Sequence, residues 1–112
     1  MKQMVIASLA LLIGLGECRA DFFTGNKLND LCSSNKLMVG VYVAGVSDYA
    51  NWDIGPKSKG LGRVNFCVRE DVSVAQLADI VCGKLTERAD VRDMPAPIFV
   101  SLSLRDAFPC KQ

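Results

Sequence analysis

Hydrophobic residues recur at helical spacing in two stretches of the chain. In residues 25–34, Leu28, Leu31 and Cys32 stand at i, i+3 and i+4, which defines one buried stripe. A longer stretch starting at Ser73 repeats the pattern at i, i+3, i+4, i+7, i+8 and i+11, with Val74, Leu77, Ala78, Val81, Cys82 and Leu85. Because one face of each stretch is apolar and the other polar, the pattern predicts two amphipathic helices.

Polar residues at the starts of these stretches support the same prediction. Thr24 precedes the first one, and its hydroxyl can accept a hydrogen bond from an unpaired amide of the first helical turn. Ser73 and Gln76 have the spacing of a capping box, in which the serine accepts from the backbone and the glutamine side chain reaches back. Ser33-Ser34-Asn35 ends the first element.

Two other stretches fit a helix and a strand equally well. The valines of residues 36–51 favour a strand by propensity, yet its apolar residues also fit helical spacing. In residues 98–108, apolar positions alternate with Ser101, Ser103 and Arg105, as in a strand. Val100, Leu104, Ala107 and Phe108 also have the spacing of one face of a helix. Prolines just before this stretch suit the first turn of a helix. The residues alone leave both assignments open.

The first twenty residues have the pattern of a secretory signal peptide. A cationic start, an apolar run and a small residue at the cleavage point occur in order, as Met1-Lys2-Gln3, residues 4–16 and Ala20. The run is too short for a membrane-spanning helix. We therefore expect a signal peptide at 1–20 and a mature chain of residues 21–112, free of the membrane, that forms one domain in an oxidising compartment.

Charge and histidine content exclude several functions. The 13 basic and 12 acidic side chains become 11 and 11 once Lys2, Arg19 and Glu17 leave with the signal peptide. A neutral mature chain argues against nucleic acid as a partner, because phosphates demand a cationic face. The absence of histidine excludes a Ser-His-Asp triad, a Cys-His pair and histidine metal sites. We expect a protein that is not an enzyme and has no cofactor and no metal.

Short motifs follow one another through the mature chain. In order they are Phe22-Phe23-Thr24-Gly25-Asn26-Lys27-Leu28, Tyr42 to Asp48, Phe66-Cys67, Val72-Ser73 with Gln76-Leu77, Arg92 with Pro95-Ala96, and Ala107-Phe108-Pro109-Cys110. In order and spacing this set resembles the Rap/Tai immunity proteins, which protect bacteria from amidase effectors of type VI secretion. The chain departs from the family pattern at Val39, where many relatives have a cysteine, and at Arg69, where many have a proline.

The resemblance implies both a fold and a function. The fold is all-α, a small single-domain bundle of about four helices with at least one disulfide, so both ambiguous stretches are expected to be helical. The implied function is a periplasmic immunity protein, often a homodimer, that binds a cognate peptidoglycan amidase effector and occludes its cleft. A periplasmic helical chaperone or stress-response binding protein is the alternative.

The four mature cysteines allow three pairings. If the third and fourth helices of such a bundle pack antiparallel, Cys67 precedes one and Cys110 follows the other at the same end. We therefore expect a Cys67–Cys110 disulfide. Cys32 and Cys82 each lie on an apolar face, and they form a second pair or remain buried thiols.

Two segments are candidates for binding a partner. The turn between the third and fourth helices, Glu87 to Met94, is short and of mixed charge, and its candidate contact residues are Glu87, Arg88, Asp90, Arg92 and Asp93. A plain solvated turn is the alternative for this segment. The second candidate is the loop from Asp53 to Arg63, with Trp52 at its base. Tryptophan often anchors interfaces, although a single tryptophan in a small domain more often packs in the core.

Overall fold

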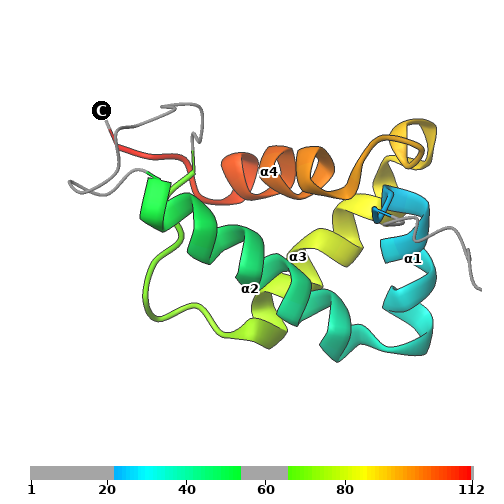
Figure 1. The fold of residues 1–112 in the computed structure, drawn as a ribbon, viewed down its shortest axis with the longest axis horizontal. Coiled ribbons are helices and arrows are strands. Elements are labelled where there is room, and N and C mark those ends of the chain that lie inside the picture. Colours follow the sequence, from blue (N-terminus) through cyan, green and yellow to red (C-terminus); the bar gives the residue numbers. More distant parts are fainter. Residues whose placement is uncertain (1–21, 54–65, 112) are drawn as a thin grey trace, which may run out of the picture.

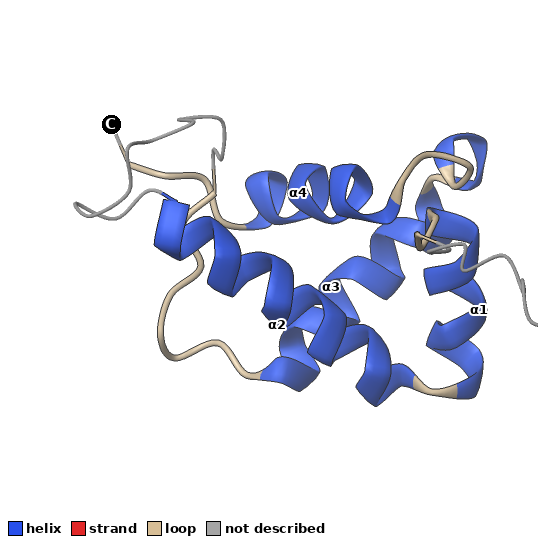
Figure 2. Cartoon of the chain, viewed as in Figure 1, coloured by secondary structure: helices blue, strands red, loops and turns tan. Residues whose placement is uncertain are grey.

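The computed structural model describes residues 22–53 and 66–111. Their elements follow in the order α1 (Gly25–Ser34), α2 (Lys36–Asp53), α3 (Val74–Glu87), a 3-10 helix η1 (Ala89–Val91) and α4 (Ala96–Ala107) (Figure 1). Within those two ranges no residue lies in a β-strand, and the only β pairing consists of two isolated bridges (Figure 2). The expected all-α bundle of four helices is confirmed.

The ambiguous stretch at residues 36–51 is helical and forms most of α2. Val39, Val43, Ser47 and Ala50 are buried along one side of this helix, at i, i+4, i+8 and i+11. A lone strand here would leave its amides and carbonyls without partners, whereas a helix pairs them within itself. Packing against the rest of the bundle therefore overrides the strand propensity of the valines.

The second ambiguous stretch forms α4, and its alternating serines do not prevent this. Ser103 is buried, and its hydroxyl donates to the carbonyl oxygen of Phe99 at 2.8 Å within the same helix. The buried Ser47 of α2 is satisfied in the same way by the carbonyl of Val43 at 3.0 Å. Each serine thus meets its hydrogen-bonding needs one turn back, so it can occupy a core position.

The core lies between α2, α3 and α4, with α1 crossing one end of the bundle (Figure 1). Its largest fully buried side chains are Phe66, Leu28, Leu85, Leu104, Val39, Val43, Val81 and Val100. Val74, which the sequence pattern places on the apolar stripe of α3, is 38% exposed. Val74 stands in the first turn of that helix, where it packs over α2 at the edge of the core.

The helix starts form as the sequence predicts. The Thr24 hydroxyl accepts from the Lys27 amide at 3.3 Å. At α3, the Ser73 hydroxyl accepts from the Gln76 amide at 3.1 Å, and the Gln76 side chain accepts from the Ser73 amide at 2.7 Å. The predicted cap and the predicted capping box are both confirmed.

Two disulfides tie the helices together. Cys32 of α1 is joined to Cys82 of α3, with Cα atoms 5.8 Å apart. Cys67, ahead of α3, is joined to Cys110, beyond α4, with Cα atoms 4.9 Å apart. The Cys67 amide also donates to the Phe108 carbonyl at 2.8 Å, and Phe66 and Pro109 form a β-bridge. The segment ahead of α3 and the segment beyond α4 thus meet at one side of the bundle.

At Gly40, α2 lies close against α3. A Cβ atom on Gly40 would lie 2.7 Å from both the carbonyl oxygen and Cγ1 of Val74. Those distances are well inside van der Waals contact, so only a residue without a side chain allows the two helices to cross here.

Candidate functional site

The turn between α3 and α4, residues 88–95, is closed by hydrogen bonds between its own residues. The Arg88 amide closes α3 by donating to the Lys84 carbonyl at 2.9 Å. The 3-10 helix η1 follows, and then the amides of Val91 and Met94 donate to the carbonyls of Arg88 and Val91, both at 3.3 Å. We call residues 88–95 the α3–α4 turn.

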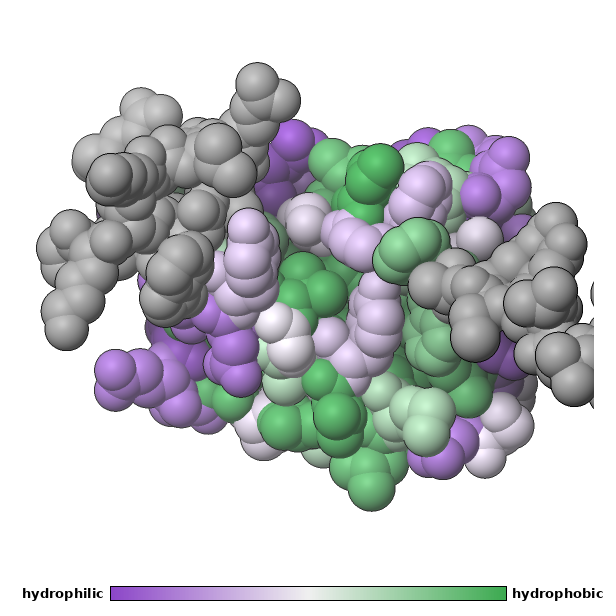
Figure 3. All heavy atoms as spheres, in the orientation of Figure 1, coloured by the Kyte–Doolittle hydropathy of each residue, from purple (hydrophilic) through white to green (hydrophobic). Residues whose placement is uncertain are grey.

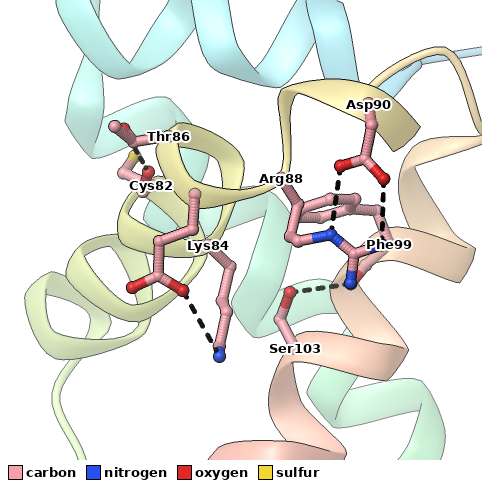
Figure 4. A network of polar contacts seen from close by, with 8 residues as sticks. Cys82, Lys84, Thr86, Arg88, Asp90, Phe99 and Ser103 are labelled. Carbon is pink, nitrogen blue, oxygen red and sulfur yellow. Dashed lines mark hydrogen bonds and ion pairs between the residues drawn. The ribbon is translucent and has the colours of Figure 1, made fainter.

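An exposed ion pair lies on this turn. The Arg88 guanidinium donates to both carboxylate oxygens of Asp90, with Nε–Oδ1 at 3.1 Å and Nη2–Oδ2 at 3.2 Å (Figure 4). These hydrogen bonds lower the pKa of the Asp90 carboxyl and raise the pKa of the Arg88 guanidinium. Because the carboxyl pKa is lowered, the pairing is present at neutral pH and is lost only as the pH falls through that lowered value.

The other predicted contact residues surround this pair. Glu87, the last residue of α3, lies 3.6 Å from the ammonium of Lys84. Asp93 is exposed. Arg92 is half-buried, and its Nε is a buried atom without a hydrogen-bond partner among the described residues. The turn thus presents fixed charges of both signs at one end of the bundle.

The start of α1 contacts the main chain of the turn from the side. The Gly25 amide donates to the Met94 carbonyl at 3.0 Å, and the Asn26 amide donates to the Arg92 carbonyl at 2.6 Å. In return, the Ala96 amide donates to the Phe23 carbonyl at 2.8 Å. We call residues 23–26 the N-terminal clasp.

A second surface stands out along α2, where the side turned away from the core is largely apolar, with Asp48 as its exposed charge. Its exposed members are Leu37, Met38, Val41 and Tyr49. Val41 and Tyr49 also line a hollow of about 540 Å³ between α2 and α4, together with residues that include Tyr42, Phe66 and Pro97. Figure 3 shows hydrophobic residues gathered on this face. We call this surface the α2 face.

The Tyr42 ring forms part of that face. It stacks on Phe23, with ring centroids 5.3 Å apart and planes 17° apart. Burial raises the pKa of the Tyr42 hydroxyl. Phe23 is also part of the N-terminal clasp, through its carbonyl. The stacking therefore connects the α2 face to the clasp.

Residues 24–110 match the model of the Rap1a immunity proteins. The chain belongs to the Rap1a immunity protein family. No curated protein and no solved structure matches it. Membership in the Rap1a family confirms the resemblance seen in the sequence motifs.

The motifs of this Rap1a family member, which are far apart in sequence, meet in space. The opening motif contains the N-terminal clasp, and the clasp bonds to the segment that carries Arg92 and Pro95-Ala96. Thr24 and Pro95 also form a β-bridge. Phe66-Cys67 meets the closing motif, Phe108 to Cys110, through a bridge and a disulfide. Two pairs of motifs therefore form two fixed connections at different places in the domain.

The structure brings together most of the predicted site residues of the Rap1a domain. Glu87, Arg88, Asp90, Arg92 and Asp93 all lie on or beside the α3–α4 turn. Both expected cysteine pairs stand at bonding distance, including Cys32 with Cys82, which the sequence left open.

Trp52 does not join that group. It belongs to the last turn of α2, at the opposite end of the domain from the α3–α4 turn (Figure 1). Its side chain lies outside the described residues, as do residues 54–63 of the loop predicted to start at Asp53.

Sequence reasoning missed the α2 face. The signal was present, because residues 36–51 are apolar at positions that cover the whole circumference of a helix. A helix that is apolar all round requires burial on all sides. In this Rap1a domain only one side of α2 packs on the core. Among the described helices none is long and apolar enough to cross a membrane.

Proposed function

We propose that this member of the Rap1a family is a periplasmic immunity protein that binds a peptidoglycan amidase effector of type VI secretion and occludes its cleft. The family membership supports an immunity role against an effector protein. The α3–α4 turn supports occlusion, because it is short and charged. Main-chain hydrogen bonds within the turn and from the N-terminal clasp hold it. The mechanism requires no chemistry of the inhibitor, which fits a chain without histidine.

The hydrogen bonds that hold the turn are the observation that carries the proposal. An obstructing segment that must become ordered on binding loses affinity to that ordering. Here the turn is already wound, and the Arg88–Asp90 pair already fixes a guanidinium and a carboxylate at its surface. Arginine side chains are enriched among the residues that dominate binding energy at protein interfaces.

Charge reversal at Arg88 tests the proposal. We expect Arg88→Glu to weaken binding of the cognate peptidoglycan amidase by about tenfold to a hundredfold, because it places two like charges side by side on the turn. The measurement is a titration of that amidase by calorimetry, together with its hydrolysis of peptidoglycan in the presence of each variant.

Arg69→Glu is the matched control. Arg69 is also exposed and also pairs with an aspartate two residues on, with Nε 3.0 Å from Oδ1 of Asp71, but it precedes α3 rather than following it. Equal affinity of both variants and the unchanged protein for the amidase would show that the turn is not the binding element. Client protection without a specific partner would instead favour the chaperone alternative.

The location proposed for the protein is the periplasm, reached through a signal peptide at residues 1–20. Two disulfides among the described residues suit an oxidising compartment. Mass spectrometry of the protein recovered from the periplasm is expected to find a chain that starts at Asp21. A chain that retains residues 1–20 there would contradict the proposal.

We also propose that the protein is a homodimer and that the α2 face is its interface. The face is apolar, and the mature chain is neutral, so two copies do not repel each other at long range. Leu37 and Val41, one turn apart on α2, form an exposed ridge, and Val41 also lines the hollow. A two-fold axis brings the same patch of both copies together, so the ridge of one copy can enter the hollow of the other.

Val41→Asp is expected to dissociate such a dimer. Val41 is 60% exposed, so the change costs the folded monomer little, whereas in the dimer it buries an unpaired carboxylate twice. We expect the dimerisation constant to weaken by about a hundredfold or more, measured by sedimentation equilibrium. Ser33→Asp, at an exposed position of α1, is the control. A monomeric unchanged protein at high concentration would refute the dimer.

A further inference from the structure

The α3–α4 turn is held by α1 as well as by its own hydrogen bonds. Within the turn, the amides of Val91 and Met94 donate at 3.3 Å. Two bonds from the N-terminal clasp reach carbonyls of the turn, at 2.6 and 3.0 Å, and Ala96, just beyond the turn, donates to the clasp at 2.8 Å. All of these lie within or near the ordinary range of N–H···O hydrogen bonds, so α1 contributes to the conformation of the turn.

The clasp uses amides that a helix cannot satisfy itself. Gly25 and Asn26 are the first residues of α1, and the first amides of a helix have no acceptor one turn back. Here the carbonyls of Met94 and Arg92 are their acceptors. The positive end of the α1 dipole faces these carbonyl oxygens, which adds to the attraction.

Gly25 permits the contact. A Cβ atom on this residue would lie 2.7 Å from the Arg92 carbonyl oxygen and 3.0 Å from the Arg92 Cα. The main chain of the turn therefore rests directly on the main chain of α1. The Cys32–Cys82 disulfide fixes the other end of α1 to α3, so α1 cannot shift without moving the helix that leads into the turn.

We infer that Gly25 and Asn26 are positioning residues for effector recognition, because the N-terminal clasp sets the main chain of the α3–α4 turn. The inference rests on the proposed function and extends it to residues that do not themselves touch the effector. A turn released from the clasp keeps its charged side chains but loses their fixed placement. The bound complex then dissociates faster, since part of the binding energy is used to order the turn.

Asn26→Pro tests this by deleting one amide. The Asn26 side chain is exposed and the amide has no acceptor within α1, so proline leaves the hydrogen bonds of α1 intact. It removes the bond to Arg92, and its Cδ takes the place of the amide hydrogen that faces the Arg92 carbonyl, so the clasp and the turn must separate. Pro97 already occupies the same helical position in α4. Lys27→Pro is the control, because the Lys27 amide donates to Thr24 and not to the turn. Thermal unfolding of both variants verifies that each is folded and shows how far their stabilities match.

The expected result is specific to the turn. Asn26→Pro should bind the cognate amidase about tenfold more weakly than Lys27→Pro does, through a faster dissociation rate, because the turn released from the clasp must be ordered again on binding. The amides of Val91 and Met94 should also exchange with solvent faster in Asn26→Pro. Gly25→Ala should act in the same direction, with Gly83→Ala as its control, because a Cβ on Gly83 meets nothing within 4 Å.

Two results would overturn the inference while leaving the proposed function intact. One is equal affinity of Asn26→Pro and Lys27→Pro for the amidase while Arg88→Glu weakens it. The other is faster exchange at Val91 and Met94 with unchanged affinity, which would make the clasp structural only. If Arg88→Glu has no effect either, the turn is not the binding element, and the proposed binding site fails together with the inference.

Discussion

Removal of the Cys32–Cys82 disulfide, by replacing both cysteines with alanine, is expected to lower the free energy of unfolding by about 4 kcal/mol. The bridge closes a loop between residues 50 apart in sequence, so its loss restores a large conformational freedom to the unfolded chain. Cys82 is also part of the core, which adds a packing loss. Urea denaturation of the purified mature protein measures the change, and a loss below about 1 kcal/mol would contradict it.

The Cys67–Cys110 pair is the comparison for this experiment. It closes a loop of similar length, with a separation of 43 residues, so the entropic part of its loss is also about 4 kcal/mol. The two losses should differ in their effect on effector binding. Only the Cys32–Cys82 bridge anchors the helix that carries the N-terminal clasp, so its removal should weaken binding more.

Gly40→Ala is expected to lower the free energy of unfolding by about 2–3 kcal/mol. The added Cβ would lie 2.7 Å from the Val74 carbonyl oxygen, and because that atom is main chain, a helix must move to make room. By helix propensity alone, alanine in place of glycine would stabilise the helix by about 1 kcal/mol. A net loss of stability in Gly40→Ala can therefore come only from the clash.

Gly83→Ala separates the clash from helix propensity. Gly83 lies in α3 with nothing within 4 Å of an added Cβ, so there the substitution should stabilise the protein by up to about 1 kcal/mol. Opposite signs for the two variants in urea denaturation are the expected outcome. A neutral or stabilising Gly40→Ala would show that the crossing of α2 and α3 is looser than described.

The sequence predicts those helices that have one apolar stripe and a polar cap. For α1 and α3, stripe and cap agree, and the predicted starts at Thr24 and Ser73 are correct. For α2, apolar residues surround the whole helix, so no single period stands out and the valines add a strand signal. Packing against α3 decides the outcome there, and one sequence read locally does not contain that information.

The candidate site was predictable only in part. The charged residues of the α3–α4 turn are adjacent in sequence, so their clustering follows once two flanking helices are assumed. The clasp was not predictable, because it joins main-chain groups of Gly25 and Asn26 to carbonyls of the distant Arg92 and Met94. Main-chain contacts leave no mark in side-chain patterns, apart from the glycine that permits the close approach.

The two long-range connections also determine when folding can finish. A chain that leaves a ribosome or a translocation channel N-terminus first exposes α1 well before residues 92–96, and Phe66 well before Pro109. The clasp can close once residues 92–96 are free, but the connection at Phe66 cannot close until Pro109 and Cys110 are free. The last connection therefore forms only when synthesis or transport is nearly complete, and a protein shortened before Phe108 would lack the Phe66–Pro109 bridge and the Cys67–Cys110 disulfide together.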